Sequence, residues 1–165
     1  MVLRIKICTV LKFHKVLMHG SDITTAMNYT RFHNKVIVRI DKGEEIASVL
    51  KQLCKSLHVT LGSITGIGAT NDVTIGLMNT KTKKYQSIRF TGDHEISSLM
   101  GNITMMNNEV YLHLHVNVSN AEHKTFGGHL TSAIVSATFE GVIDVMDGQV
   151  NRKFDQAAGL NLLDL

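Results

Sequence analysis

The segment Tyr111–Ser119 alternates strictly between polar and apolar side chains. A period of two is typical of a β-strand with one face in the core and the other face outside it. The polar face carries His113 and His115, whose Cα atoms lie about 6.6 Å apart on the same side of such a strand. The segment therefore predicts a half-buried strand that presents two imidazoles to one point.

A third histidine, His129, follows the pair Gly127–Gly128, and we expect a glycine turn there to bring its ring beside the other two. Three neutral imidazoles with an open fourth position suit a catalytic or ligand-binding zinc ion. Nickel, iron and copper accept the same ligands, so the pattern predicts a divalent transition metal, zinc first, at His113, His115 and His129. The alternative is that these histidines are solvated or hydrogen-bonded side chains on the polar face of a strand.

The composition favours one globular domain. The chain has 165 residues, of which 44% are hydrophobic, and this is enough for a substantial core. Its 17 basic and 14 acidic residues are scattered, so the net charge of +3 defines no footprint for nucleic acid. The two cysteines, Cys8 and Cys54, form no disulfide framework and no Cys-x-x-Cys pair, which favours a reducing compartment, the cytoplasm.

Residues 1–26 are basic and apolar, and organised pattern begins only after Met27. Basic residues interrupt the apolar run, so no uncharged stretch reaches the length of a signal peptide or a membrane span. We therefore expect no membrane partner. An edge strand, a disordered leader and an extension upstream of a start at Met27 all fit, and we favour the last, with the domain at 27–165.

One helix is predicted with particular clarity. Lys35–Ile40 is β-branched and predicts a strand, and Asp41 then resembles an N-cap with Glu44 three residues later. Behind it, apolar residues recur at helical spacing and predict a helix that runs to about Leu57. The stripe places Cys54 in the core rather than at a reactive site. It consists of Ile46, Val49, Leu50, Leu53, Cys54 and Leu57.

The remaining segments predict strands and turns. Residues 58–69 contain three glycines but no Lys-Ser/Thr pair, so we predict a strand with a bulge or a close backbone approach rather than a phosphate loop. Residues 72–78 and 84–91 predict a hairpin, and residues 132–146 predict a further strand. Asp147–Gly148 is expected to close a last hairpin.

Two carboxylates are candidate catalytic residues. Glu140 lies in the middle of an otherwise apolar or small-residue strand, and Glu95 follows His94 near the end of a loop. Glu140 could pair with a basic group or orient a ligand histidine, and Glu95 with His94 could support a ligand or face a substrate. Either carboxylate could act as an acid or base. For Glu95 and His94, an ordinary surface position is the alternative.

Four motifs in this order resemble the plants-and-prokaryotes conserved domain family: TGIGA (Thr65–Ala69), GDHEISSLMG (Gly92–Gly101), LHLHVNVS (Leu112–Ser119) and GGHL (Gly127–Leu130). The resemblance covers roughly Tyr29–Leu165. It implies an α/β (α+β) fold, a largely antiparallel β-sheet with a flanking α-helix, assembled as a homotrimer. Prokaryotic members are often labelled proposed DNA-binding proteins, after plant relatives that bind DNA largely through an AT-hook. This chain contains no proline and therefore no such hook.

The fold of this family is similar to that of acetolactate decarboxylase, whose zinc is held by a His-x-His pair and a later histidine. His113, His115 and His129 match that pattern by residue type.

The first functional hypothesis is a homotrimeric regulatory or binding module that holds zinc and contacts DNA or another protein. The second is a zinc-dependent enzyme, a lyase or hydrolase, that binds a small carboxylated or carbonyl substrate at the metal. Sequence-specific DNA binding by the domain itself would need a basic face.

Overall fold

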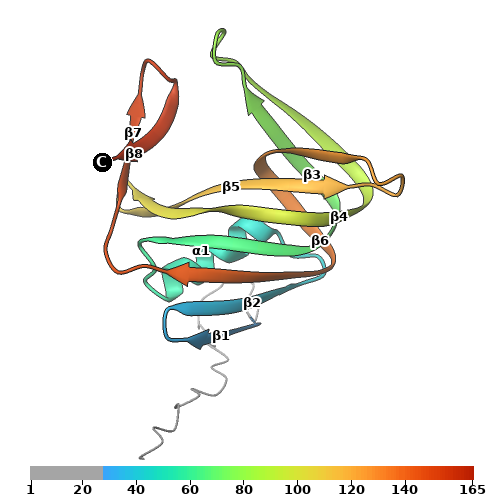
Figure 1. Cartoon of the computed structure of the whole chain (residues 1–165), viewed down its shortest axis with the longest axis horizontal. Coiled ribbons are helices and arrows are strands. Elements are labelled where there is room, and N and C mark those ends of the chain that lie inside the picture. Colours follow the sequence, from blue (N-terminus) through green and yellow to red (C-terminus); the bar gives the residue numbers. More distant parts are fainter. Residues whose placement is uncertain (1–27) are drawn as a thin grey trace, which may run out of the picture.

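The computed structural model describes residues 28–165, so the extension expected at residues 1–26 lies outside the described residues (Figure 1). The described residues form a largely antiparallel sheet with a flanking α-helix, which confirms the predicted α+β class. No helix in this range is long and apolar enough to cross a membrane. The elements are β1 (Asn28–Phe32), β2 (Lys35–Asp41), α1 (Ile46–Ser56), β3 (Gly62–Met78), β4 (Tyr85–Met106), β5 (Glu109–Ser119), β6 (Thr125–Val145), β7 (Asn151–Asp155) and β8 (Leu160–Asp164).

The sheet follows the order β1-β2-β6-β3-β4-β7-β8, and β5 pairs with both β4 and β6. Because β3 also pairs with β4 and with β6, the four strands β3, β4, β5 and β6 are joined in a closed ring. The pairs are antiparallel except for one parallel bridge between Met105 and Asn151. Figure 1 shows how these strands curve. The apolar residues of β5, such as Leu114 and Val116, are buried on one face of the ring, and the polar residues of β5 lie on the other face.

Helix α1 packs against β5 and β6 and buries the predicted apolar stripe from Ile46 to Cys54. Cys54 is fully buried in the core, which confirms the predicted position, and this burial raises the pKa of its thiol to about 12. The predicted start of the helix was wrong. Glu45, not Asp41, is the N-cap, because the chain first turns at Gly43 and bridges to Ile134 before the helix begins.

The glycines of β3 permit a bulge and a close backbone approach, as the sequence predicts. The register with β4 shifts between Gly66 and Gly68, which is a bulge. A Cβ atom on Gly66 would lie 2.3 Å from the Phe139 ring, and one on Gly68 would lie 2.3 Å from the Thr138 carbonyl oxygen. The bend in β3 therefore lets β6 approach more closely than any side chain would allow.

The hairpin expected around Asp147–Gly148 does not form. β7 pairs with β8 and touches β4 at one bridge, and it does not return along β6. The physical reason is that the last part of β6 already pairs with β2 on one side and with β3 on the other, so it has no free edge. The chain crosses instead to β4, where Met105 donates its backbone N–H to Val150.

Candidate metal centre

Two adjacent strands carry the three histidines. β5 supplies His113 and His115, and β6 supplies His129, which lies directly opposite His115 in the antiparallel ladder. The three side chains lie on one face of this ladder, opposite the face that buries Leu114 and Val116 in the core. Cross-strand pairing, and not a bend in the chain, therefore brings the third ring to the other two.

The glycine turn predicted at Gly127–Gly128 was wrong. Both glycines lie inside β6, and the chain reverses earlier, at residues 120–124, where the Asn120 side chain accepts backbone N–H groups. The glycines are needed because β6 is crowded at this point. A Cβ atom on Gly128 would lie 2.8 Å from the Gly76 carbonyl oxygen, and one on Gly127 would lie 2.1 Å from the Asn117 amide oxygen.

The three rings form a compact triangle. Their centroids are 5.2 Å apart for His113 and His115, 5.2 Å for His113 and His129, and 5.5 Å for His115 and His129. One ring nitrogen from each lies within 4.8 Å of the other two. Nitrogens bound to one zinc ion at about 2.0–2.1 Å in tetrahedral geometry are about 3.4 Å apart, so the rings would rotate inward to bind one ion.

The surroundings keep two of the rings neutral. Burial, followed by the positive charge of Arg152 and the other two histidines, lowers the pKa of His113 to about 4. Burial and the nearby His115 also lower the pKa of His129 below its usual value. An imidazole must be neutral to offer a lone pair to a metal, and near pH 7 these two side chains meet that condition.

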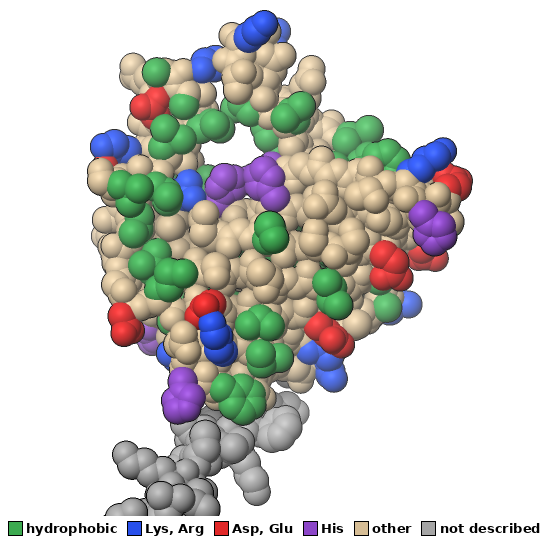
Figure 2. Space-filling model, in the orientation of Figure 1, with side chains coloured by type: hydrophobic (Ala, Val, Ile, Leu, Met, Phe, Trp, Pro, Cys, Tyr) green, Lys and Arg blue, Asp and Glu red, His purple; other side chains and the backbone are tan. Residues whose placement is uncertain are grey.

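The histidines lie at the base of a hollow. Figure 2 shows histidine side chains grouped between two raised arms, the β7–β8 hairpin and the tip of the β3–β4 hairpin. The arms are joined, because the Lys83 ammonium group donates to the backbone carbonyls of Ala157 and Ala158 in the β7–β8 turn. A small molecule that reached the histidines would therefore enter from the side of this arch.

Different side chains flank the two ends of the cluster. The Tyr85 ring packs edge-on to His129 at 6.2 Å, and its hydroxyl lies 3.0 Å from the Thr131 hydroxyl. At the other end, Asn102 lies opposite His113 in the β4–β5 ladder, and Arg152 donates to Asn102 over a distance of 2.8 Å.

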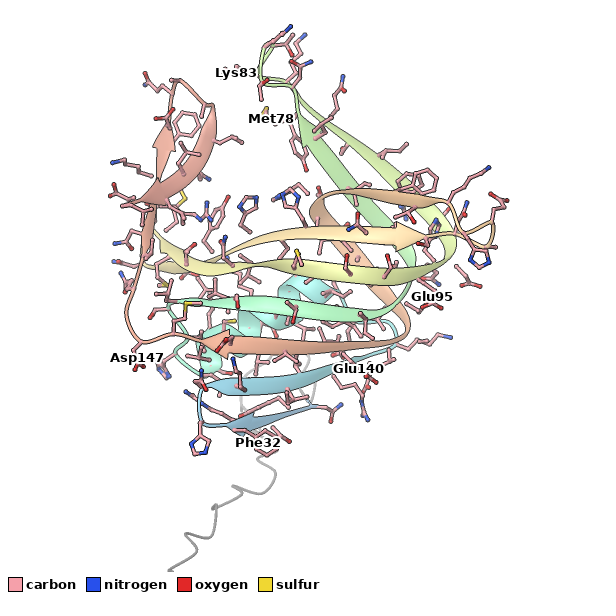
Figure 3. All side chains as sticks on the ribbon, viewed as in Figure 1. Phe32, Met78, Lys83, Glu95, Glu140 and Asp147 are labelled. Atoms are coloured by element: carbon pink, nitrogen blue, oxygen red, sulfur yellow. The ribbon has the colours of Figure 1, made fainter. Side chains whose placement is uncertain are left out.

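The structure does not bring the two candidate carboxylates to the histidines. Glu95 and Glu140 line a separate cavity of about 370 Å³, together with Ile67, Gly68, Ile96, Ser97 and Thr138 (Figure 3). Glu140 lies on β6 eleven residues beyond His129, and a strand rises about 3.3 Å per residue, so the length of the strand separates its carboxylate from the cluster. Within the described residues, the histidine cluster contains no carboxylate.

The sequence patterns assigned no role to Asn102, Tyr111 or Arg152. Tyr111 belongs to the polar face that the alternation of β5 predicts, so that face was the available signal. Asn102 joins the same face only through its pairing with β5. For Arg152 no local signal exists, because its position depends on how the β7–β8 hairpin lies against β4.

A family model described as the Plants and Prokaryotes Conserved domain matches residues 27–147, which is more than half of the chain. The chain belongs to this family. Among solved structures, a proposed DNA-binding protein from Bacteroides thetaiotaomicron is 39% identical, with a TM-score of 0.82, over 84% of this chain and 96% of its own. A comparison with curated protein sequences gave no match.

Two further structures resemble this Plants and Prokaryotes Conserved domain. A metal-containing protein from Archaeoglobus fulgidus is 26% identical, with a TM-score of 0.74, over 85% of this chain and 99% of its own. An α-acetolactate decarboxylase from Bacillus subtilis is 14% identical, with a TM-score of 0.50, over 82% of this chain and 63% of its own. The second match shows a similarity of fold alone, and it confirms the predicted fold resemblance.

Proposed function

We propose that this domain is a metal-binding module in which His113, His115 and His129 hold one divalent transition ion, with zinc as the leading choice. The observation that carries the proposal is the mutual approach of three histidine nitrogens to within 4.8 Å. The downward shifts in the pKa of His113 and of His129 support it, because neutral imidazoles are the required ligands. The metal-containing relative from Archaeoglobus fulgidus adds support from a protein of similar fold.

The proposed role is regulatory or binding rather than catalytic. A catalytic zinc acts with an acid or base within hydrogen-bond reach, and the described residues place no carboxylate in the cluster. The alternative is a zinc-dependent lyase or hydrolase for a small carboxylated or carbonyl substrate, which the open hollow above the rings favours (Figure 2). In that case the ion would polarise an oxygen or activate water. Tyr85, whose ring packs against His129, and Tyr111, on the same strand as His113, would then offer hydroxyl groups to the substrate.

Removing two ligands should abolish metal binding. We expect the purified wild-type chain to hold about one zinc ion, and the double variant His113→Ala/His115→Ala to hold less than about a tenth of that, because one imidazole cannot retain the ion. Elemental analysis after gel filtration measures this. The matched control is His33→Ala/His58→Ala, which removes two exposed histidines outside the cluster and should keep its zinc. Equal zinc in both double variants would refute the assignment.

We infer a homotrimer from the family and from an apolar row on the outer face of the sheet. The row crosses four neighbouring strands and contains, in order, Ile37 on β2, Val142 on β6, Thr65 on β3 and Met100 on β4. Its three apolar side chains are exposed. The row ends at His115, which pairs with Met100. An exposed apolar row of this kind is stabilised when another subunit covers it.

A charge placed in this row should dissociate the trimer. We expect Met100→Glu, at a side chain that is 58% exposed, to sediment as a monomer while the wild-type chain sediments as a trimer. Leu77→Glu is the control, because Leu77 is 70% exposed but lies on the β3–β4 arm and not in the row. Analytical ultracentrifugation distinguishes the two states. A trimer that tolerates Met100→Glu would place the subunit interface elsewhere.

DNA is the proposed macromolecular partner that the relatives suggest, since the Bacteroides protein is described as a proposed DNA-binding protein. With a net charge of only +3, we expect weak binding that depends on phosphate contacts. A gel-shift titration at 50 and 200 mM salt should show a steep loss of affinity, on the order of tenfold or more. Affinity that is high and independent of salt would contradict this expectation. No shift even at 50 mM salt would exclude DNA as a partner.

A further inference from the structure

We propose that Arg152 is the anion-recognition residue of the histidine centre and that the ligand class of this centre is a small carboxylate. Its burial, its hydrogen bonds and its place beside His113 point to this assignment. The inference rests on the proposed metal site for the bound ion. The position of the arginine is a separate observation, so the two proposals can fail independently.

Arg152 is buried and only partly satisfied by the protein. It is 8% exposed, and its Nε, Nη1 and Nη2 atoms donate to Thr104 Oγ1 at 2.9 Å, the Asn161 carbonyl at 2.7 Å and Asn102 Oδ1 at 2.8 Å. Its guanidinium carbon lies 5.0 Å from the centre of the Tyr111 ring. Each terminal nitrogen of a guanidinium carries two N–H groups, so each keeps one N–H that these bonds do not use.

Among the residues that the structure describes, this arginine has no acidic partner. The ion pairs within residues 28–165 involve other lysines and arginines, and no described carboxylate lies within 4 Å of this guanidinium. Its neighbour Lys153, on the opposite side of β7, does pair with Asp164. A buried cation without a counter-ion is costly, and a site that retains one commonly uses it to bind an anion.

The guanidinium lies next to the histidines. Asn102, which accepts from Arg152, faces His113 directly across the β4–β5 ladder. The positive charge of Arg152 is the largest electrostatic influence on His113 after burial, which is consistent with this proximity. An anion held at Arg152 would therefore also be held beside the triangle of imidazoles.

Charge balance then selects the ligand. Three neutral imidazoles do not offset a divalent cation, and the described residues contribute no carboxylate to the cluster. Together with Arg152, a loaded centre would carry a total charge of about +3 in a partly buried hollow, which an anion offsets. A carboxylate is planar and accepts two parallel N–H bonds from a guanidinium, so it fits the spare N–H groups on the two terminal nitrogens.

Fluorine NMR of trifluoroacetate tests this proposal directly. The full chain, loaded with zinc and with its zinc content measured, is titrated with trifluoroacetate in a buffer free of carboxylates. We expect line broadening that acetate reverses, and no broadening of the uncharged analogue trifluoroacetamide. Arg152→Gln should weaken trifluoroacetate binding at least tenfold with unchanged zinc content. Lys153→Gln, which removes a charge from the same hairpin, should not weaken binding.

The outcomes separate the two proposals. Trifluoroacetate binding that survives Arg152→Gln, or equal binding of trifluoroacetamide, overturns the role of Arg152. Displacement by inorganic phosphate at a tenfold lower concentration than acetate overturns the carboxylate class. If Arg152→Gln does not fold, Arg152→Lys replaces it, because a lysine retains the charge but cannot form the paired bonds and should still bind at least tenfold more weakly. If the wild-type chain holds no zinc, the proposed function fails. The zinc-free chain is then titrated with trifluoroacetate: binding that Arg152→Gln weakens supports the role of Arg152, and binding that it does not weaken, or no binding, overturns that role.

Discussion

Replacing Phe139 with alanine should lower the free energy of unfolding by about 3–5 kcal/mol. Phe139 is the largest of the fully buried side chains, and it lies where β6 packs tightly against the glycines of β3. A methyl group on Gly66 or Gly141 would fall 2.3 or 2.9 Å from its ring carbons. The ring thus fills the space that these glycines leave open, and backbone atoms cannot move in to close the cavity that its removal creates.

Urea denaturation followed by circular dichroism measures this loss. Phe32→Ala is the matched control, because Phe32 lies on the edge strand β1 and is 45% exposed (Figure 3). We expect the control to lose less than about 1 kcal/mol. A loss below about 1.5 kcal/mol for Phe139→Ala would mean that β6 shifts to fill the cavity, and that the glycines do not hold the two strands at a set distance.

Zinc should stabilise the wild-type chain by about 4 kcal/mol when free zinc exceeds the dissociation constant a thousandfold. The reason is linkage: the three histidines lie together only in the folded chain, so binding free energy adds to the free energy of unfolding. For a domain of this size the melting temperature should rise on the order of 10 °C. Differential scanning calorimetry with zinc, and again with excess chelator, measures the shift.

The double variants provide the contrast for this experiment. His113→Ala/His115→Ala should melt at the same temperature with zinc and with chelator, whereas His33→Ala/His58→Ala should respond as the wild type does. An equal response from both would show that zinc stabilises the fold through other residues. A response from neither, with the wild type also unchanged, would remove the metal from the proposed function and leave the family assignment intact.

Local periodicity was a reliable guide to individual elements. The alternation from Tyr111 to Ser119 predicted β5, and the apolar stripe from Ile46 to Cys54 predicted α1 and its buried face. Both signals repeat over many residues, and each repeat adds to the apolar area buried on one side. The glycines of β3 were also interpreted correctly, because a Thr/Ile-rich segment that contains glycine tolerates few alternatives to a bulged strand.

The predictions that failed depended on the choice of neighbour. Asp41 has the chemistry of an N-cap, but Glu45 takes the position because its carboxylate also accepts the Ala133 N–H from β6. Gly127–Gly128 has the composition of a turn, but the pair lies within β6, where Gly76 and Asn117 leave no room for side chains. In both cases a residue on another strand decided between two locally acceptable conformations.

The sequence by itself determined the family, the strand-rich class, the helix and the identity of the three histidines, since each follows from residue type and from spacing along one segment. Only the tertiary structure decided that His129 lies opposite His115, that Glu95 and Glu140 lie away from the histidines, and that Arg152 lies beside them. The physical reason is that side-chain periodicity determines which face a residue occupies. Strand order and register determine which residues share that face, and these depend on which sheet edges remain free and on how closely two backbones can approach.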